Sequence, residues 1–212
     1  RFESRGLGDV YKRQIKDGDC WYIDLSFSSE SDGPEDKRFF ELKMYLIRGI
    51  KNIDLFLSRY SDVDLIATIG NFDGLHLGHQ HIINNMDKDA QDNNWKKLVI
   101  FTEPHAKEFF AESLGTDEEK PPRIFPWPEK VRKLKELGVE FSFFLSFNNQ
   151  LRNMTPETFI DEVLSRLSIK KMVIGDDFRF GANRKGDFNF LKDWGNSCLL
   201  YTSDAADEVG GV

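Results

Sequence analysis

Two histidines and three glycines lie close together in the run Thr68–His79, and these residue types could bind and orient a phosphate group. Glycine permits backbone conformations and close approaches that a side chain forbids, so a ligand can lie directly on the main chain. His76 and His79 are three residues apart, which places them on one side of a helix start. The free N–H groups of a helix N-terminus favour an anion. The run therefore predicts a phosphate site.

The residues on either side of this run predict the elements that hold it. Leu65–Ile69 is a short apolar strand pattern ending at a glycine, and apolar residues recur at helical spacing from Leu77 onward. The common nucleotide motifs do not fit, since neither a Walker sequence nor the dinucleotide Gly-x-Gly-x-x-Gly is present. The sequence therefore indicates a strand, a glycine-rich turn and a helix, with the histidines at the helix start.

The histidines could also serve a purpose unrelated to phosphate. A pair at helical spacing is often an ordinary surface or core pair. A zinc site could use the four histidines of the chain, although no cysteine lies near them. They are His76, His79, His81 and His105.

Strand and helix patterns alternate along the rest of the chain, which predicts a parallel α/β sheet with ligands beyond the carboxyl ends of its strands. Further helices are expected after Pro128 and from Thr155, and Phe109–Trp127 is expected to be a surface loop. The further predicted strands are Lys96–Thr102, Phe141–Phe147 and Lys171–Ile174.

A second polar motif follows the last of these strands. Gly175–Gly181 alternates charged residues with Phe178 and Phe180. Such a run could be a solvated charged turn. The alternation fits better with a flat, polar-rimmed ligand packed on phenylalanine while Arg179 meets a phosphate.

The run Thr68–His79 resembles the signature of the bacterial FAD synthetases, which are bifunctional riboflavin kinase/FMN adenylyltransferases. Its end resembles the His-x-Gly-His of the nucleotidylyltransferase superfamily, and Gly175–Gly181 resembles the other signature of the same family. The resemblance implies a Rossmann-like parallel sheet, here C-terminally truncated. It also implies transfer of AMP from ATP to FMN, giving FAD and pyrophosphate, with Mg²⁺ as cofactor.

The resemblance further implies roles for individual residues. It assigns no residue of the protein as a metal ligand. Asn71, His76 and His79 would contact the ATP phosphates and carry catalysis. The other ATP-site residues would be Gly70, Phe72, Asp73, Gly74, Gly78 and His105. Those of the FMN and Mg²⁺ side would be Asn148, Asp176, Asp177, Phe178 and Arg179.

Two other functions stay open beside this one. The His-x-Gly-His core also serves adenylyl transfer to nicotinate mononucleotide, phosphopantetheine or glycerol phosphate. A non-catalytic nucleotide- or metal-binding module is the second alternative.

The two ends of the chain are interpreted as an artefact of DNA sequencing, because one short DNA element can encode both of them. Asp9–Gln14 can be encoded by GAT GTG TAT AAG AGA CAG, and the reverse complement of that DNA, read one base in, encodes Cys198–Ser203. We interpret residues 1–14 and 198–212 as translated sequencing adaptor, and 15–43 as upstream sequence without order. The expected FMN adenylyltransferase domain is then 44–197. The Ser/Thr-rich segment and the riboflavin kinase barrel of the family are not found, so an inactive or impaired fragment is expected.

Charge and hydropathy exclude several partners. The net charge of −7 belongs mostly to the ends, because residues 44–197 hold 21 Lys and Arg against 23 Asp and Glu. A nearly neutral domain gives no electrostatic case for nucleic acid. No apolar run of about 18 residues and no signal-peptide pattern is found, so a soluble cytoplasmic protein is expected. ATP and FMN are the expected partners, with no membrane or protein partner evident.

Overall fold

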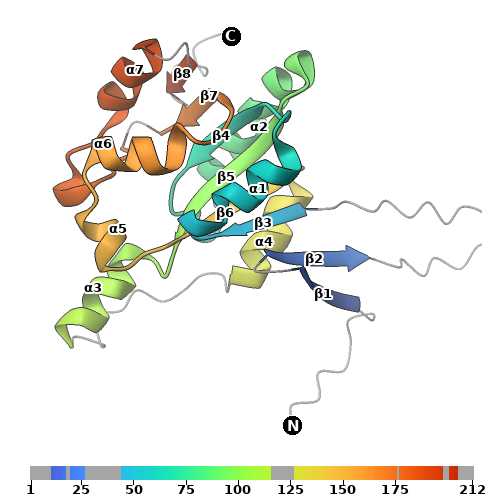
Figure 1. Ribbon diagram of the computed structural model, residues 1–212, viewed down its shortest axis with the longest axis horizontal. Coiled ribbons are helices and arrows are strands. Elements are labelled where there is room, and N and C mark those ends of the chain that lie inside the picture. Colours follow the sequence, from blue (N-terminus) through green and yellow to red (C-terminus); the bar gives the residue numbers. More distant parts are fainter. Residues whose placement is uncertain are drawn as a thin grey trace, which may run out of the picture.

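The computed structural model describes residues 11–17, 20–26, 44–115, 127–175, 177–197 and 201–204. Within these ranges the chain forms an eight-stranded sheet in the order β1-β2-β3-β6-β5-β4-β7-β8 (Figure 1). The strands are β1 (Tyr11–Asp17), β2 (Cys20–Ser26), β3 (Met44–Arg48), β4 (Leu65–Ile69), β5 (Lys96–Glu103), β6 (Phe141–Ser146), β7 (Ile169–Ile174) and β8 (Tyr201–Asp204).

Five of these strands form the parallel centre of the sheet. They are β3, β6, β5, β4 and β7, which along the chain is the order 1-4-3-2-5. The predicted Rossmann-like α/β sheet is therefore confirmed. Its inner strands read as continuous apolar runs because helices cover both of their faces.

Helices cover the two faces in separate layers (Figure 1). One face packs against α1 (Ile53–Tyr60), the π-helical segment η3 (Ile160–Leu164) and α7 (Phe188–Ser197). The other packs against α2 (Leu77–Asn93) and α4 (Trp127–Glu136). The remaining helical segments are η1 (Ile50–Asn52), α3 (Ala106–Leu114), α5 (Asn149–Asn153), α6 (Pro156–Phe159) and η4 (Ala182–Arg184).

The strand β5 shows how one sequence serves both layers. Leu98 and Ile100 enter the apolar cluster on the α1 side, whereas Val99 and Phe101 enter the cluster on the α2 and α4 side. This alternation follows from the two-residue period of a strand. All four side chains are buried, so the sheet is fixed between its helices.

The helix starting at Thr155 and the end of α4 are as the sequence predicts. Thr155 caps α6 by accepting from the backbone N–H of Thr158, and Pro156 lies in the first turn. Gly138 follows α4 with a φ of 73°, a left-handed angle that glycine adopts without strain.

The expected loop Phe109–Trp127 is partly wrong, because α3 continues to Leu114 and α4 begins at Trp127. Glu108 and Ala111 of α3 are buried and lie three residues apart, which is the spacing of one helix face. This packing favours helix over loop. Residues 116–126 lie outside the described residues.

The strands β1, β2 and β8 fall in the segments that we interpret as adaptor-derived or upstream sequence. β1 and β2 form an antiparallel hairpin beside β3, and β8 lies parallel to β7. The pairing describes how these residues lie against the sheet; their DNA origin and the proposed boundaries at 43 and 197 stay predictions. Across the described residues, no helix is long and apolar enough to cross a membrane.

Candidate active site

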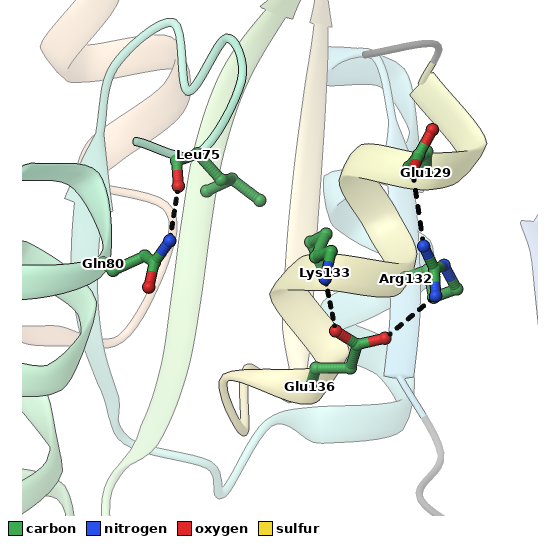
Figure 2. A network of polar contacts seen from close by, with 6 residues as sticks. All are labelled: Leu75, Gln80, Glu129, Arg132, Lys133 and Glu136. Carbon is green, nitrogen blue, oxygen red and sulfur yellow. Dashed lines mark hydrogen bonds and ion pairs between the residues drawn. The ribbon is translucent and has the colours of Figure 1, made fainter. Parts of the chain in front are cut away.

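The loop between β4 and α2 is held in a strained conformation by its own apolar residues. Phe72 and Leu75 adopt left-handed backbone angles, with φ values of 47° and 40°, which side-chain-bearing residues rarely do. Both side chains are buried in the cluster beneath α4. The side-chain amide of Gln80 donates to the Leu75 carbonyl at 2.8 Å (Figure 2). The buried side chains and this hydrogen bond hold the loop shape.

His76 is the N-cap residue of α2. Its Nδ1 accepts from the backbone N–H of His79 at 3.4 Å, and the two rings stack with centroids 3.7 Å apart. Because Nδ1 is the acceptor, the ring N–H of His76 is on Nε2. A Cβ at Gly78 would lie 3.3 Å from the His76 ring. The absence of a side chain at Gly78 therefore leaves room for this ring at the start of α2.

His79 is half-buried and uncharged at neutral pH. Burial is the main cause that lowers its pKa to about 4, and the charges of His76 and Lys130 lower the pKa further against the opposing carboxylates of Asp177 and Asp73. Among the described residues its buried Nδ1 has no hydrogen-bond partner. A buried ring nitrogen without a protein partner is suited to meet a ligand.

His105 caps α3 in the same manner. Its Nδ1 accepts from the backbone N–H of Lys107 at 3.0 Å. Burial is the main cause that lowers the His105 pKa, whereas Asp73 raises it. Asp73 thus acts on both His79 and His105, so β4 and β5 deliver their histidines to the same edge of the sheet.

The second motif reaches that edge from β7. Phe178 stacks on Phe180 with centroids 5.6 Å apart, and Phe180 packs on Phe159. Backbone hydrogen bonds of 3.0 Å in both directions join Phe180 to Gly186 and close the turn. Arg179 donates from Nη1 to the Phe178 carbonyl at 2.7 Å. Asp176 lies outside the described residues.

A cavity of about 840 Å³ joins the two motifs. Asn148 does not line it within the described residues. This residue is exposed, and its Oδ1 caps α5 by accepting from the N–H of Leu151 at 2.9 Å. The predicted site residues that line the cavity are Gly70, Asn71, Phe72, His79, Asp177, Phe178 and Arg179. Of the described ones, Asp73, Gly74, His76, Gly78 and His105 are not among the residues that line it.

Several cavity-side residues were missed by reasoning from the sequence. Phe110 of α3 and Phe147 pack edge to face, and Arg152 of α5 lies 5.0 Å over the Phe110 ring. The two helices follow the carboxyl ends of β5 and β6 and lie beside each other there (Figure 1). Arg184 in the turn after Phe180 also lines the cavity. Only the position of Phe147 at a strand end signalled such a role in the sequence.

Lys130 was also missed, and it lies directly behind the histidine loop. Its Nζ donates to the Asn71 carbonyl at 3.2 Å and lies 4.8 Å over the Phe101 ring. The lysine is 59 residues from Asn71, and no local pattern marks it.

No group of three or more His, Cys, Asp or Glu in the described part of the chain is arranged to hold a metal ion. His81 is exposed on α2, where its Nε2 lies 3.2 Å from the side-chain Nδ2 of Asn85.

A parallel 1-4-3-2-5 sheet that carries a glycine loop and a histidine-capped helix at its carboxyl edge defines a Rossmann-like protein of the nucleotidylyltransferase fold. Residues 59–208 match the family model described as FAD synthetase, and the chain belongs to the FAD synthetase family.

Curated relatives agree with that assignment. The chain is 38% identical over 150 residues to a bifunctional riboflavin kinase/FMN adenylyltransferase of Escherichia coli K12, covering 70% of this chain and 45% of that protein. It is 36% identical over 167 residues to the enzyme of the same description from Pseudomonas fluorescens, covering 78% and 50%. The chain thus spans about half the length of the curated relatives it matches.

One solved structure supports the fold alone. It is described as a macrolide-efflux protein from Streptococcus pneumoniae, and it superposes with a TM-score of 0.59 at 23% identity. The match covers 76% of this chain and 50% of that one.

Proposed function

We propose that this domain binds ATP and FMN and transfers AMP between them, forming FAD and pyrophosphate. The observation that carries the proposal is the cavity that joins the glycine-histidine loop to the Phe178–Arg179 turn. Its volume of about 840 Å³ is in the range of small-molecule sites. Membership of the FAD synthetase family supports the choice of ATP and FMN.

The two ends of the cavity suit the two substrates. The ATP phosphates would lie on the loop, where backbone N–H groups, the N-terminus of α2 and the histidines meet an anion. The flavin ring would pack among Phe110, Phe147 and Phe178, whose faces suit a flat aromatic system. Arg152, Arg179 and Arg184 line the cavity on that side as cations.

The transfer needs no general base. The FMN phosphate is already an anion near pH 7, since its second pKa is about 6. One of its oxygens forms a bond to the α-phosphorus of ATP, and the bond from that phosphorus to the β-phosphate oxygen breaks to release pyrophosphate. The protein has to align the two anions and offset their repulsion. The ring N–H groups of His76 and of the neutral His79 would supply donors for this purpose.

Mg²⁺ would enter with the ATP phosphates, because this ion is commonly held by substrate phosphates and one or two carboxylates. Asp73 and Asp177 are the described carboxylates whose charges reach His79. The ion would neutralise phosphate charge.

The test compares FAD formation from ATP and FMN in the full chain with that of His76→Ala/His79→Ala. The double variant is expected to stay folded and to lose the product. His81→Ala is the matched control, since His81 lies on the same helix but contacts Asn85 on its exposed side. Unchanged FAD formation in the double variant would overturn the assignment of the histidines.

Two further readouts separate the alternatives. Supplying nicotinate mononucleotide, phosphopantetheine or glycerol phosphate in place of FMN tests the acceptor, and a product with any of them instead of FAD rejects FMN specificity. Calorimetric titration with ATP tests binding alone. Binding without turnover by the wild-type chain favours a nucleotide-binding module.

A further inference from the structure

Lys130 is one of several lysines that the fold buries among the described residues. It lies in the first part of α4 and only 5% of its surface is exposed. On the same helix, Arg132, Lys133, Glu129 and Glu136 form an exposed ion-pair network with distances of 3.1 to 3.2 Å (Figure 2). The helix therefore has a solvent face with ordinary paired charges, and Lys130 lies on the opposite, buried face.

The contacts of Lys130 connect α4 to the histidine loop. Its Nζ donates to the Asn71 carbonyl at 3.2 Å, and its charge lies 4.8 Å over the face of Phe101. Val131 and Leu134 of α4 pack in the same apolar cluster as Phe72 and Leu75 of the loop. One turn of α4 thus contacts the loop through both apolar packing and a hydrogen bond.

Burial of the Lys130 ammonium group requires compensating contacts. Moving an ammonium group out of water costs several kcal/mol unless its surroundings compensate it. The Asn71 carbonyl and the Phe101 face are among the groups that offset that cost.

The electrostatic effect of Lys130 reaches the site. Its charge lowers the pKa of both His79 and His105, behind burial as the main cause in each case. The other charges that act on the two rings are those of His76, Lys107, Asp73, Glu108 and Asp177. A positive charge that disfavours protonation of the histidine rings also attracts the negative charge of a polyphosphate bound beside them.

We propose that Lys130 is a positioning residue of the ATP site, fixing the loop through the Asn71 carbonyl and placing a buried positive charge behind the phosphates. The inference rests on the proposed function, because it takes ATP as the ligand of the loop. Lys130 is absent from the lining of the cavity among the described residues, so it acts through the loop and by its charge.

The test measures the dissociation constants of ATP, AMP, adenosine and FMN for Lys130→Met, Lys130→Gln and Lys130→Arg. Methionine keeps the apolar stem, and glutamine keeps a donor for Asn71 without the charge. For Lys130→Met, ATP affinity should fall about 10- to 100-fold, the range for losing a hydrogen bond to a charged group. The loss should be smaller for AMP and absent for adenosine and FMN. Arginine should restore most of the ATP affinity, and glutamine only part of it.

Lys133→Met is the matched control, since Lys133 lies on the same helix and pairs with Glu136 at the surface. It should bind ATP as the wild type does. The inference would be overturned if Lys130→Met lost as much affinity for adenosine as for ATP, or lost no affinity for ATP. In that case ATP binding and FAD formation by the wild type would still support the proposed function. Absence of ATP binding by the wild type would overturn both. If Lys130→Met does not fold, the difference between glutamine and arginine at this position decides the question.

Discussion

The rings of His76 and His79 stack with their centroids 3.7 Å apart at the start of α2. Two stacked imidazoles repel each other when both are charged, and His76 accordingly contributes to the lowered pKa of His79. Burial keeps His79 neutral at the place proposed for the ATP phosphates. In that proposal the ring N–H groups of the pair would act as donors, and the positive charge would come from the helix N-terminus and from Lys130.

The lowered pKa of His79 predicts a loss of stability in mild acid. The pKa falls from 6.5 in the unfolded chain to about 4 in the folded one, so between these values only the unfolded state binds the proton. The free energy of unfolding should therefore fall as the pH drops from 6.5 to 4, by about 1 to 2 kcal/mol because solvent screens the half-buried ring, and level off below. Above pH 6.5 both states are neutral and this contribution is constant.

Chemical denaturation at a series of pH values measures this effect. His105 contributes in the same direction, because its pKa is lowered too. The difference between the wild type and His79→Asn isolates the share of His79. Parallel pH curves for the two proteins would contradict the prediction.

Gly78→Ala should weaken ATP binding more than it changes stability. The new methyl group would lie 3.3 Å from the His76 ring and displace it from the helix start. Alanine also has a higher helix propensity than glycine, so the free energy of unfolding should stay within about 1 kcal/mol of the wild type. ATP affinity should fall about 10-fold, since small displacements at a binding site have large effects. Calorimetry and thermal unfolding on one preparation check both parts, and unaltered ATP affinity would contradict the steric argument.

Lys97→Met should destabilise the fold without involving the site. Lys97 is buried at the opposite end of β5, where its Nζ contacts Asp87 at 2.5 Å and the Leu137 carbonyl at 2.7 Å. Removing the ammonium leaves that carbonyl without its donor and should cost about 1 to 3 kcal/mol. Lys96→Met is the control, because its exposed pair with Glu140 at 3.7 Å is worth less than about 1 kcal/mol. Equal urea midpoints for the two variants would refute the expectation.

Removal of metal ions should leave the ligand-free protein equally stable. The described residues hold no cluster of three or more metal-ligating side chains, and His81 points to Asn85 instead. Thermal unfolding after dialysis against EDTA should therefore give the same midpoint within about 1 °C, well below the roughly 2 to 4 °C that 1 kcal/mol produces in a domain of this size. A clear drop, reversed by zinc, would favour a structural metal site built on the histidines.

The local patterns of the sequence determined the parallel sheet and the glycine- and histidine-bearing loop between β4 and α2. Strand, glycine turn and histidine helix at Leu65–His79 follow from short-range rules of period, φ and capping, and these rules depend on neighbouring residues only. The Thr155 cap and the Gly138 end were predictable for the same reason. The motif at Gly175–Gly181 was visible because its charges and aromatics are consecutive.

Only the tertiary structure decided which side chains are buried and which meet. It buries His79 more than His76, turns Asn148 into the cap of α5, and brings Lys130 to Asn71 across 59 residues. Each outcome depends on how helices from distant parts of the chain pack on the sheet, and a single sequence contains no record of those distances. Burial in turn sets the pKa of His79, so the protonation state of the site is a consequence of the fold.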